Sequence, residues 1–158
     1  LLVSSQQGAE YAAHFGLPMS LAYFIDQECL HLADYYRKNF KSSGFSEKPR
    51  VSVGIFAICA QSNLEAQALA MSAALWRKKI KAGDFSPFPT KKEAKSVIGT
   101  QTLTNSDNKT FIGSPETIKE RLEPLLNKTQ AEELKVVTIC EPFSARAESY
   151  RLLKELFS

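Results

Sequence analysis

The sequence predicts an α/β fold in which four parallel strands are each followed by a helix. Residues 51–60 are apolar on both faces, as expected for a parallel strand covered by helices. Strand-like and helix-like segments alternate four times, with connections long enough for right-handed crossovers. Four such units are half of a (β/α)8 TIM barrel, which typically needs about 250 residues. The chain has 158 residues, so we expect 1–158 to be a single partial domain.

The first half of the chain supplies two of the four strand–helix units. Apolar spacing and turn residues predict strands at residues 1–3 and 19–24, and helices at about 9–15 and 28–40. A polar loop, residues 4–8, joins the first strand to the first helix. A glycine and a proline follow this helix and end it.

Capping signals mark the helices of the second half. Ser62 with Glu65, and Thr90 with Glu93, have the spacing of a capping box. The expected strands are at 51–60 and 134–140. A helix is expected from Ser62 to about Lys81, and the residues on its inner side would be Leu64, Ala68, Met71 and Leu75. A short helix should follow Thr90, a helix capped by Ser114 should run from Pro115 to about Lys128, and Ser144 should cap the last helix.

The composition is that of a globular protein, and the cysteines indicate that it resides in a reducing compartment. Apolar residues make up 44% and charged residues 23% of the chain, and the net charge is +3. The basic residues are scattered and no nucleic-acid recognition motif is present, so we expect no nucleic-acid partner. The apolar runs are too short to cross a bilayer and no secretory signal is visible, so we expect a cytoplasmic protein without a membrane partner. Cys29, Cys59 and Cys140 lack metal-ligand spacing and are expected to be buried thiols, with no metal site.

Four segments together resemble the bacterial luciferase-like monooxygenases. They are residues 4–19 (SSQQGAEYAAHFGLPM), 83–90 (GDFSPFPT), 112–118 (IGSPETI) and 146–153 (RAESYRLL), and they occur in the order of the carboxy-terminal half of that family. Each segment alone is weakly specific, but the set covers essentially the whole chain.

The resemblance implies a fold, a cofactor and an activity. The family fold is a (β/α)8 barrel that binds reduced FMN at the carboxyl ends of its strands and uses O2 to oxygenate a small organic substrate. The chain maps to strands five to eight of that barrel. The isolated chain is therefore expected to be inactive, and to need a missing amino-terminal half, a second chain or a homo-oligomer. Residues 83–111 match the family's active-site lid, which is consistent with the length of this connection.

By the same resemblance, residues 4–8 are the turn that binds the flavin phosphate. Ser4 and Ser5 would donate hydroxyls, Gln7 an amide, and Gly8 would allow close backbone approach. Gln6 and Gln7 are bulkier than the residues often found there. A capped helix without a ligand would give the same local pattern.

Tyr23 lies where the luciferases carry an aromatic residue near the flavin ring, although an aromatic residue in a strand is more often part of the core.

No residue can be assigned a catalytic role from the sequence. It contains no Ser/His/Asp set that we can assign, no zinc spacing, no P-loop and no GxGxxG motif. A flavin would itself carry the chemistry, which is consistent with this lack. Two alternatives remain open: a non-enzymatic flavin-binding or vestigial half-barrel protein, and a small α/β binding module unrelated to flavin.

Overall fold

The computed structural model describes residues 1–99 and 110–157, which divide into two compact units. The first unit comprises Leu1–Phe56 and Arg121–Val137, and the second comprises Ala57–Glu120 and Thr138–Ser158. Strand β3 and helix α5 contribute residues to both units. Whether the chain acts as one partial domain remains a prediction.

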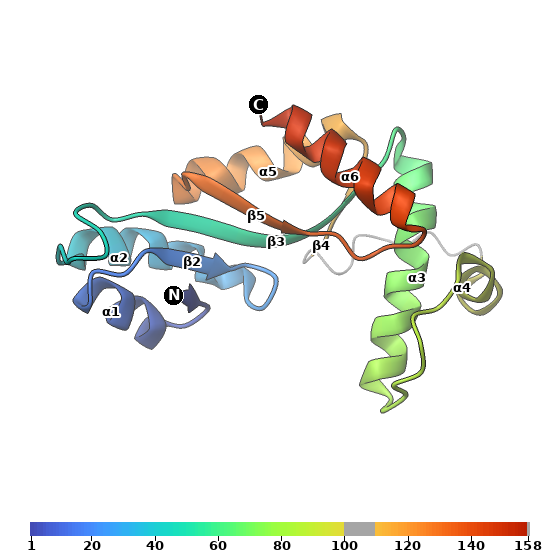
Figure 1. The fold of residues 1–158 in the computed structure, drawn as a ribbon, viewed down its shortest axis with the longest axis horizontal. Helices are drawn as coiled ribbons and strands as arrows, with labels where there is room; N and C mark the ends of the chain where they lie inside the picture. Colours follow the sequence, from blue (N-terminus) through green and yellow to red (C-terminus); the bar gives the residue numbers. More distant parts are fainter. Residues whose placement is uncertain (100–109, 158) are drawn as a thin grey trace. The chain divides into compact units, whose positions relative to one another are not determined.

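The first unit begins with two of the predicted strand–helix units (Figure 1). Its elements are β1 (Leu2–Val3), α1 (Gln6–His14), β2 (Met19–Ala22), the 3₁₀ helix η1 (Gln27–His31), α2 (Leu32–Asn39), the first part of β3 (Val51–Cys59), the end of α5 (Pro115–Thr129) and β5 (Glu133–Val137). Helices α1 and α2 pack against each other. Helix α1 also contacts β1, and α2 contacts β2, so the two helices cover one face of these strands.

The strands β1, β2, β3 and β5 are parallel, as predicted. Strand β1 pairs with β2, β2 pairs with β3, and β3 pairs with β5. One row of the register contains Leu2, Ser20, Ser52 and Glu133. The carboxyl ends of these strands therefore meet at one edge, which is where ligands bind in parallel α/β sheets.

The two faces of this sheet differ in burial. Side chains alternate between the faces along a strand. In one row Val3, Leu21 and Val53 are 2%, 0% and 0% exposed. In the adjacent row Leu2 is 57% exposed, whereas the two serines of that row are 8% and 5% exposed. The first row forms the core with the helices, and the second is exposed at the edge strand β1 and buried on β2 and β3.

The second unit is built around α3. Its elements are the end of β3, α3 (Asn63–Lys81), α4 (Lys91–Ile98), β4 (Thr110–Gly113), the start of α5 and α6 (Phe143–Leu156). Helix α3 contacts α4 and β4. The core cluster of this unit consists of Ile58, Ala60, Ala66, Leu69, Ala70 and Cys140.

Two of the predicted helix caps are confirmed. The Ser62 hydroxyl accepts a hydrogen bond from the Glu65 N–H at 3.2 Å, and α3 begins at the next residue. Thr90 and Glu93 form the reciprocal capping box of α4. All three cysteines are buried and free, also as predicted.

Several local predictions are wrong. Helix α1 begins at Gln6 rather than near Ala9, because Ser5 caps it. The N-cap of α6 is Pro142, so Ser144 lies inside the first turn. Leu64 is 80% exposed, and the buried side of α3 is formed by Ala66, Leu69, Ala70, Ser72, Ala73 and Leu75. Strand β4 was not predicted.

Residues 100–109 of the predicted lid, 83–111, lie outside the described residues. Over the described part of the chain, every helix is too short or too polar to pass through a bilayer.

Candidate functional site

The candidate phosphate site lies at the carboxyl end of β1, where the chain turns into α1. Ser5 has an extended backbone and caps the helix: its hydroxyl oxygen accepts from the Gly8 N–H at 3.3 Å. The N–H groups of Gln6 and Gln7 lie in the first turn of α1, so no carbonyl within the helix can accept a hydrogen bond from them. The first turn of α1 contains no acidic residue. The helix dipole and these donors therefore make the turn electropositive.

The two glutamine side chains are engaged along the helix. The Gln6 amide donates to the Glu10 carboxylate at 3.3 Å, and the Gln7 amide donates to the Tyr11 hydroxyl at 3.0 Å. Each contact joins residues four apart, so the amide groups follow the side of the helix away from its amino end. Their bulk consequently does not cover the first-turn N–H groups.

Gly8 packs against the strand that precedes the turn. A Cβ atom at this position would lie 3.2 Å from Val3 Cγ1 and 3.5 Å from Ser5 Oγ. The absence of a side chain therefore allows α1 to start close to β1. Ser4, which directly follows β1, is partly buried at the same turn.

Tyr23 follows β2 at the same edge of the sheet. Since Val3 is in register with Leu21, Ser5 and Tyr23 are each two residues beyond that pair. Burial raises the pKa of the Tyr23 hydroxyl, whereas the positive charge of Arg121 in α5 opposes the rise. The structure thus brings the predicted turn and Tyr23 to neighbouring strand ends. Whether they bind a flavin remains a prediction.

The sequence analysis did not single out two aromatic residues near this edge. Phe24 follows Tyr23, and its ring centroid lies 5.0 Å from that of Phe56 in β3. A Cβ atom at Gly54 would lie 3.1 Å from Phe24 Cε1. A glycine within an apolar strand often marks a close approach by another group, and this signal could have drawn attention to the pair.

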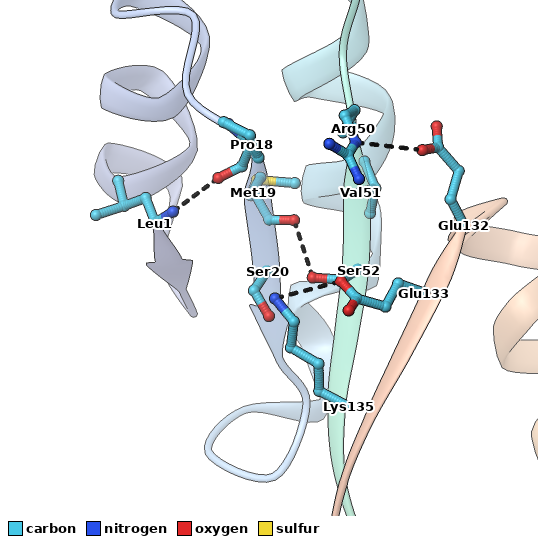
Figure 2. Close-up of a pocket in the computed structure, with 10 residues that line it drawn as sticks. All are labelled: Leu1, Pro18, Met19, Ser20, Arg50, Val51, Ser52, Glu132, Glu133 and Lys135. Atoms are coloured by element: carbon cyan, nitrogen blue, oxygen red, sulfur yellow. Dashed lines mark hydrogen bonds and ion pairs between the residues drawn. The ribbon is translucent and has the colours of Figure 1, made fainter. Parts of the chain in front are cut away.

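A pocket of about 220 Å³ lies at the opposite, amino-terminal edge of the same strands (Figure 2). Ser20 and Ser52 lie within it, and the Ser52 hydroxyl donates to the Met19 carbonyl at 3.4 Å. Lys135 Nζ lies 3.5 Å from the Glu133 carboxylate, with both side chains more than half exposed. Exposed ion pairs contribute little to stability. Because ligand sites of parallel folds lie at the carboxyl edge, this pocket is not the candidate site.

Metal binding has no support in the described residues. Over residues 1–99 and 110–157, His, Cys, Asp and Glu side chains form no group of three that could hold an ion.

Comparison with known proteins finds relatives of about twice this length. No protein-family model matches the chain. The chain is 34% identical to the uncharacterized protein YceB of Bacillus subtilis, covering 96% of this chain and 47% of YceB. It is 27% identical to a luciferase-like monooxygenase of Escherichia coli, covering 99% of this chain and 48% of that protein.

Solved structures also match this chain with about half of their own length. Apo-MsnO8 superposes with a TM-score of 0.89 at 29% identity, covering 99% of this chain and 49% of MsnO8. The oxygenating constituent of 3,6-diketocamphane monooxygenase, solved in complex with FMN, has a TM-score of 0.64 at 16% identity over 96% of this chain and 45% of its own, which is a likeness of fold alone. The chain spans about half the length of these relatives. The matches confirm the resemblance predicted from the sequence.

Proposed function

We propose that this chain, whose sequence and fold are those of about half of a luciferase-like monooxygenase, is the carboxy-terminal, phosphate-binding half of such an enzyme. The whole enzyme would use reduced FMN and O2 to oxygenate a small organic substrate. The observation that carries the proposal is the capped, acid-free start of α1 at the carboxyl end of β1. A solved structure with the same fold contains FMN, which supports this choice of cofactor.

The turn has the donors that a phosphate dianion requires. The Ser5 oxygen accepts from Gly8 and still has its own proton to donate. Ser4 offers a second hydroxyl, and Gln6 and Gln7 offer backbone N–H groups in the first helical turn. In this proposal the Gln7 amide would have to exchange its contact with Tyr11 for the phosphate, or remain a neighbour of it.

Other parts of the chain would position the flavin and protect it. Bound reduced FMN would supply the electrons for the reaction with O2. Tyr23 is proposed to lie near the flavin ring, and residues 83–111 to act as a lid that excludes water. We assign no catalytic residue within this chain.

The enzyme would need more polypeptide than this chain. Relatives are about twice as long, and among the described strands β1 pairs with β2 alone. An unpaired parallel edge attracts another strand. We propose that an amino-terminal half, or a second copy in a homo-oligomer, supplies the remaining wall, and that the isolated chain is inactive.

A non-enzymatic flavin-binding protein is the second candidate, because the turn at the start of α1 could hold a flavin phosphate without any turnover. The two candidates share the phosphate turn. They differ in turnover, which is measured as oxygen uptake by the chain and a complementing half in the presence of reduced FMN and an added aldehyde. Oxygen uptake would support the enzyme. Flavin binding without oxygen uptake would support the binding protein.

The phosphate turn is tested by placing a negative charge in the first turn of α1. Gln7→Glu keeps the contact with Tyr11, because a carboxylate accepts from its hydroxyl, and acidic residues suit a helix start. A carboxylate roughly 6 Å from a phosphate dianion costs about 1.4 kcal/mol in water, or about tenfold in affinity. Saturation-transfer NMR titrations measure FMN and riboflavin, which lacks the phosphate.

We expect Gln7→Glu to weaken FMN binding about tenfold and to leave riboflavin binding unchanged. Gln67→Glu in α3 makes the same charge change in the second unit and should affect neither ligand. Equal losses in both variants, or equal affinities of FMN and riboflavin for the unmodified chain, would exclude a phosphate site at this turn.

A further inference from the structure

We propose that the pocket at the amino-terminal edge of β2, β3 and β5 binds a small zwitterion of the α-amino acid class, at a site separate from the phosphate turn. The pocket has a volume of about 220 Å³ and lies entirely within the first unit. We call it the amino-edge pocket. Its polar lining consists of Ser20, Arg50, Ser52, Glu132, Glu133 and Lys135.

The floor of the amino-edge pocket is a row of polar side chains. Ser20 of β2 is in register with Ser52 of β3, and Ser52 is in register with Glu133 of β5. The two serines are 8% and 5% exposed. Because neighbouring strands lie about 4.8 Å apart, the three side chains stand close together on one face of the sheet. A few convergent polar groups at the bottom of a pocket are what fixes the orientation of a small ligand.

The hydroxyl of Ser20 is buried and lacks a hydrogen-bond partner among the described residues. The Ser52 hydroxyl, by contrast, donates to the Met19 carbonyl at 3.4 Å. Buried polar groups are normally satisfied, and one that is not carries a desolvation cost that a bound molecule would relieve. Rotation about the Cα–Cβ bond of Ser20 turns its hydroxyl toward the pocket, where a ligand oxygen can accept the proton.

The charged groups of the pocket form two loose ion pairs. Arg50 Nε lies 3.8 Å from the Glu132 carboxylate, and Lys135 Nζ lies 3.5 Å from the Glu133 carboxylate (Figure 2). Both distances exceed the roughly 2.7–2.9 Å of a direct charge-assisted hydrogen bond, so each group keeps donors or acceptors for a ligand. All of these side chains are more than half exposed, and exposed ion pairs cost little to open.

The balance of these charges favours a zwitterion. Two cations and two carboxylates leave the lining neutral, so an ion of either sign would meet a like charge. A molecule with one charge of each sign can instead face each group with its opposite. Figure 2 shows the Lys135 side chain reaching from β5 toward Ser20, which brings its ammonium group to the floor of the pocket.

The spacing of the charges and the size of the pocket point to an α-amino acid. In such a molecule the ammonium nitrogen and the carboxylate carbon are joined through one carbon by two bonds of about 1.5 Å each. This spacing is comparable with the 3.5 Å between Lys135 and Glu133. The ligand carboxylate then faces Lys135 and Ser20 while its ammonium group faces Glu133. At about 30 Å³ per water, a pocket of 220 Å³ has room for about seven waters, which suits a ligand of the size of alanine.

The test compares three molecules of matched size. L-Alanine carries both charges, propionate lacks the ammonium group, and ethylamine lacks the carboxylate. Each is titrated into the full chain, and the backbone amide signals are followed by heteronuclear NMR. We expect L-alanine to shift signals around the amino-edge pocket saturably in the millimolar range. It should bind about tenfold more tightly than either analogue, because each analogue lacks one charged hydrogen-bonding group.

Substitutions in the pocket identify the groups that hold the ligand. Lys135→Gln and Glu133→Gln each remove one charge and should weaken L-alanine binding about tenfold. Lys38→Gln makes the same type of change at an exposed residue in the last turn of α2 and should leave binding unchanged. Ser20→Ala should weaken binding about fivefold. It should not lower the free energy of unfolding, because the hydroxyl that it removes has no partner in the described part of the chain. A loss of binding in this variant is thereby separated from a folding defect.

Two results with the unmodified chain would overturn the inference. If propionate binds as tightly as L-alanine, the pocket is an anion site and the ammonium group is not recognised. If none of the three molecules gives a saturable shift, the pocket is a gap in the packing and holds no ligand of this class.

The amino-edge pocket and the phosphate turn lie at opposite edges of the strands, so either proposal can fail alone. Gln7→Glu should leave L-alanine binding unchanged, and Lys135→Gln should leave FMN binding unchanged. If Lys135→Gln weakens FMN as much as it weakens L-alanine, the two sites are not separate and the inference fails. If FMN does not bind while L-alanine binds as described, the proposed function fails and the amino-edge pocket stands.

Discussion

The buried hydroxyl of Ser149 is expected to hold the end of β3 within the second unit. This residue of α6 is 0% exposed, and its hydroxyl oxygen accepts from the Cys59 N–H at 2.9 Å. The Thr138 hydroxyl lies 3.5 Å from the same oxygen. Ser149→Ala removes the acceptor and leaves a buried backbone N–H without it.

The size of the effect follows from this geometry. A buried donor that loses its partner costs about 1–3 kcal/mol. Because Cys59 is 1% exposed, water cannot readily replace the hydroxyl, and we expect a loss of about 2 kcal/mol in the free energy of unfolding. In a chain of this size that corresponds to a fall of about 4–8 °C in Tm.

Urea unfolding followed by tryptophan fluorescence measures this loss in the appropriate unit. Trp76 is the only tryptophan of the chain and lies in α3 of the second unit. Ser144→Ala in the same helix is the control. Since Pro142 is the N-cap, exposed Ser144 can be replaced with a change near zero. Our reasoning would be refuted if the free energy of unfolding of Ser149→Ala lies within about 0.5 kcal/mol of that of the unmodified chain. It would also be refuted if Ser144→Ala lowers the free energy of unfolding more than Ser149→Ala does.

Two further predictions concern backbone strain and a buried thiol. Gly16 has φ +61°, and a Cβ atom there would lie 2.4 Å from the Lys41 carbonyl oxygen. Gly16→Ala should therefore lower the free energy of unfolding, measured in urea, by more than about 3 kcal/mol. Gly83→Ala, with φ +79° and open space, should cost only about 1–2 kcal/mol, and equal costs would refute the steric argument. Burial raises the pKa of the Cys59 thiol to about 11, with smaller contributions from nearby carboxylates. Because the folded state disfavours the thiolate, stability from this group is present below its unfolded pKa and is lost as pH rises from about 9 to 11. Cys59→Ala should show a shallower loss of stability over this range, and parallel pH profiles would contradict the prediction.

Local signals in the sequence predicted the helix starts that depend on neighbouring residues alone. Ser62 and Thr90 cap α3 and α4 because the hydroxyl and the N–H it accepts from are three residues apart. The same type of signal at Ser144 failed, since Pro142 already has the extended backbone of an N-cap and the helix begins earlier. A cap residue is therefore decided by competition between nearby candidates.

The buried face of a helix was harder to predict. Leu64 is apolar but lies in the first turn of α3, where the neighbouring elements leave it 80% exposed. The small residues Ala66 and Ala70 are buried instead, because they allow close packing in the core cluster. Hydrophobicity shows which residues can be buried, and the positions of the neighbouring elements decide which are.

The sequence by itself determined the class of the fold and the site of one turn. A strand that is apolar on both faces and four alternating units require a parallel sheet, and the turn at Ser5 follows from residues adjacent in the chain. Only the tertiary structure brought Phe24 to Phe56 across Gly54, and placed Tyr23 beside the end of β1. These pairs depend on the register between strands, which is set by packing over long sequence separations and leaves no local pattern to read.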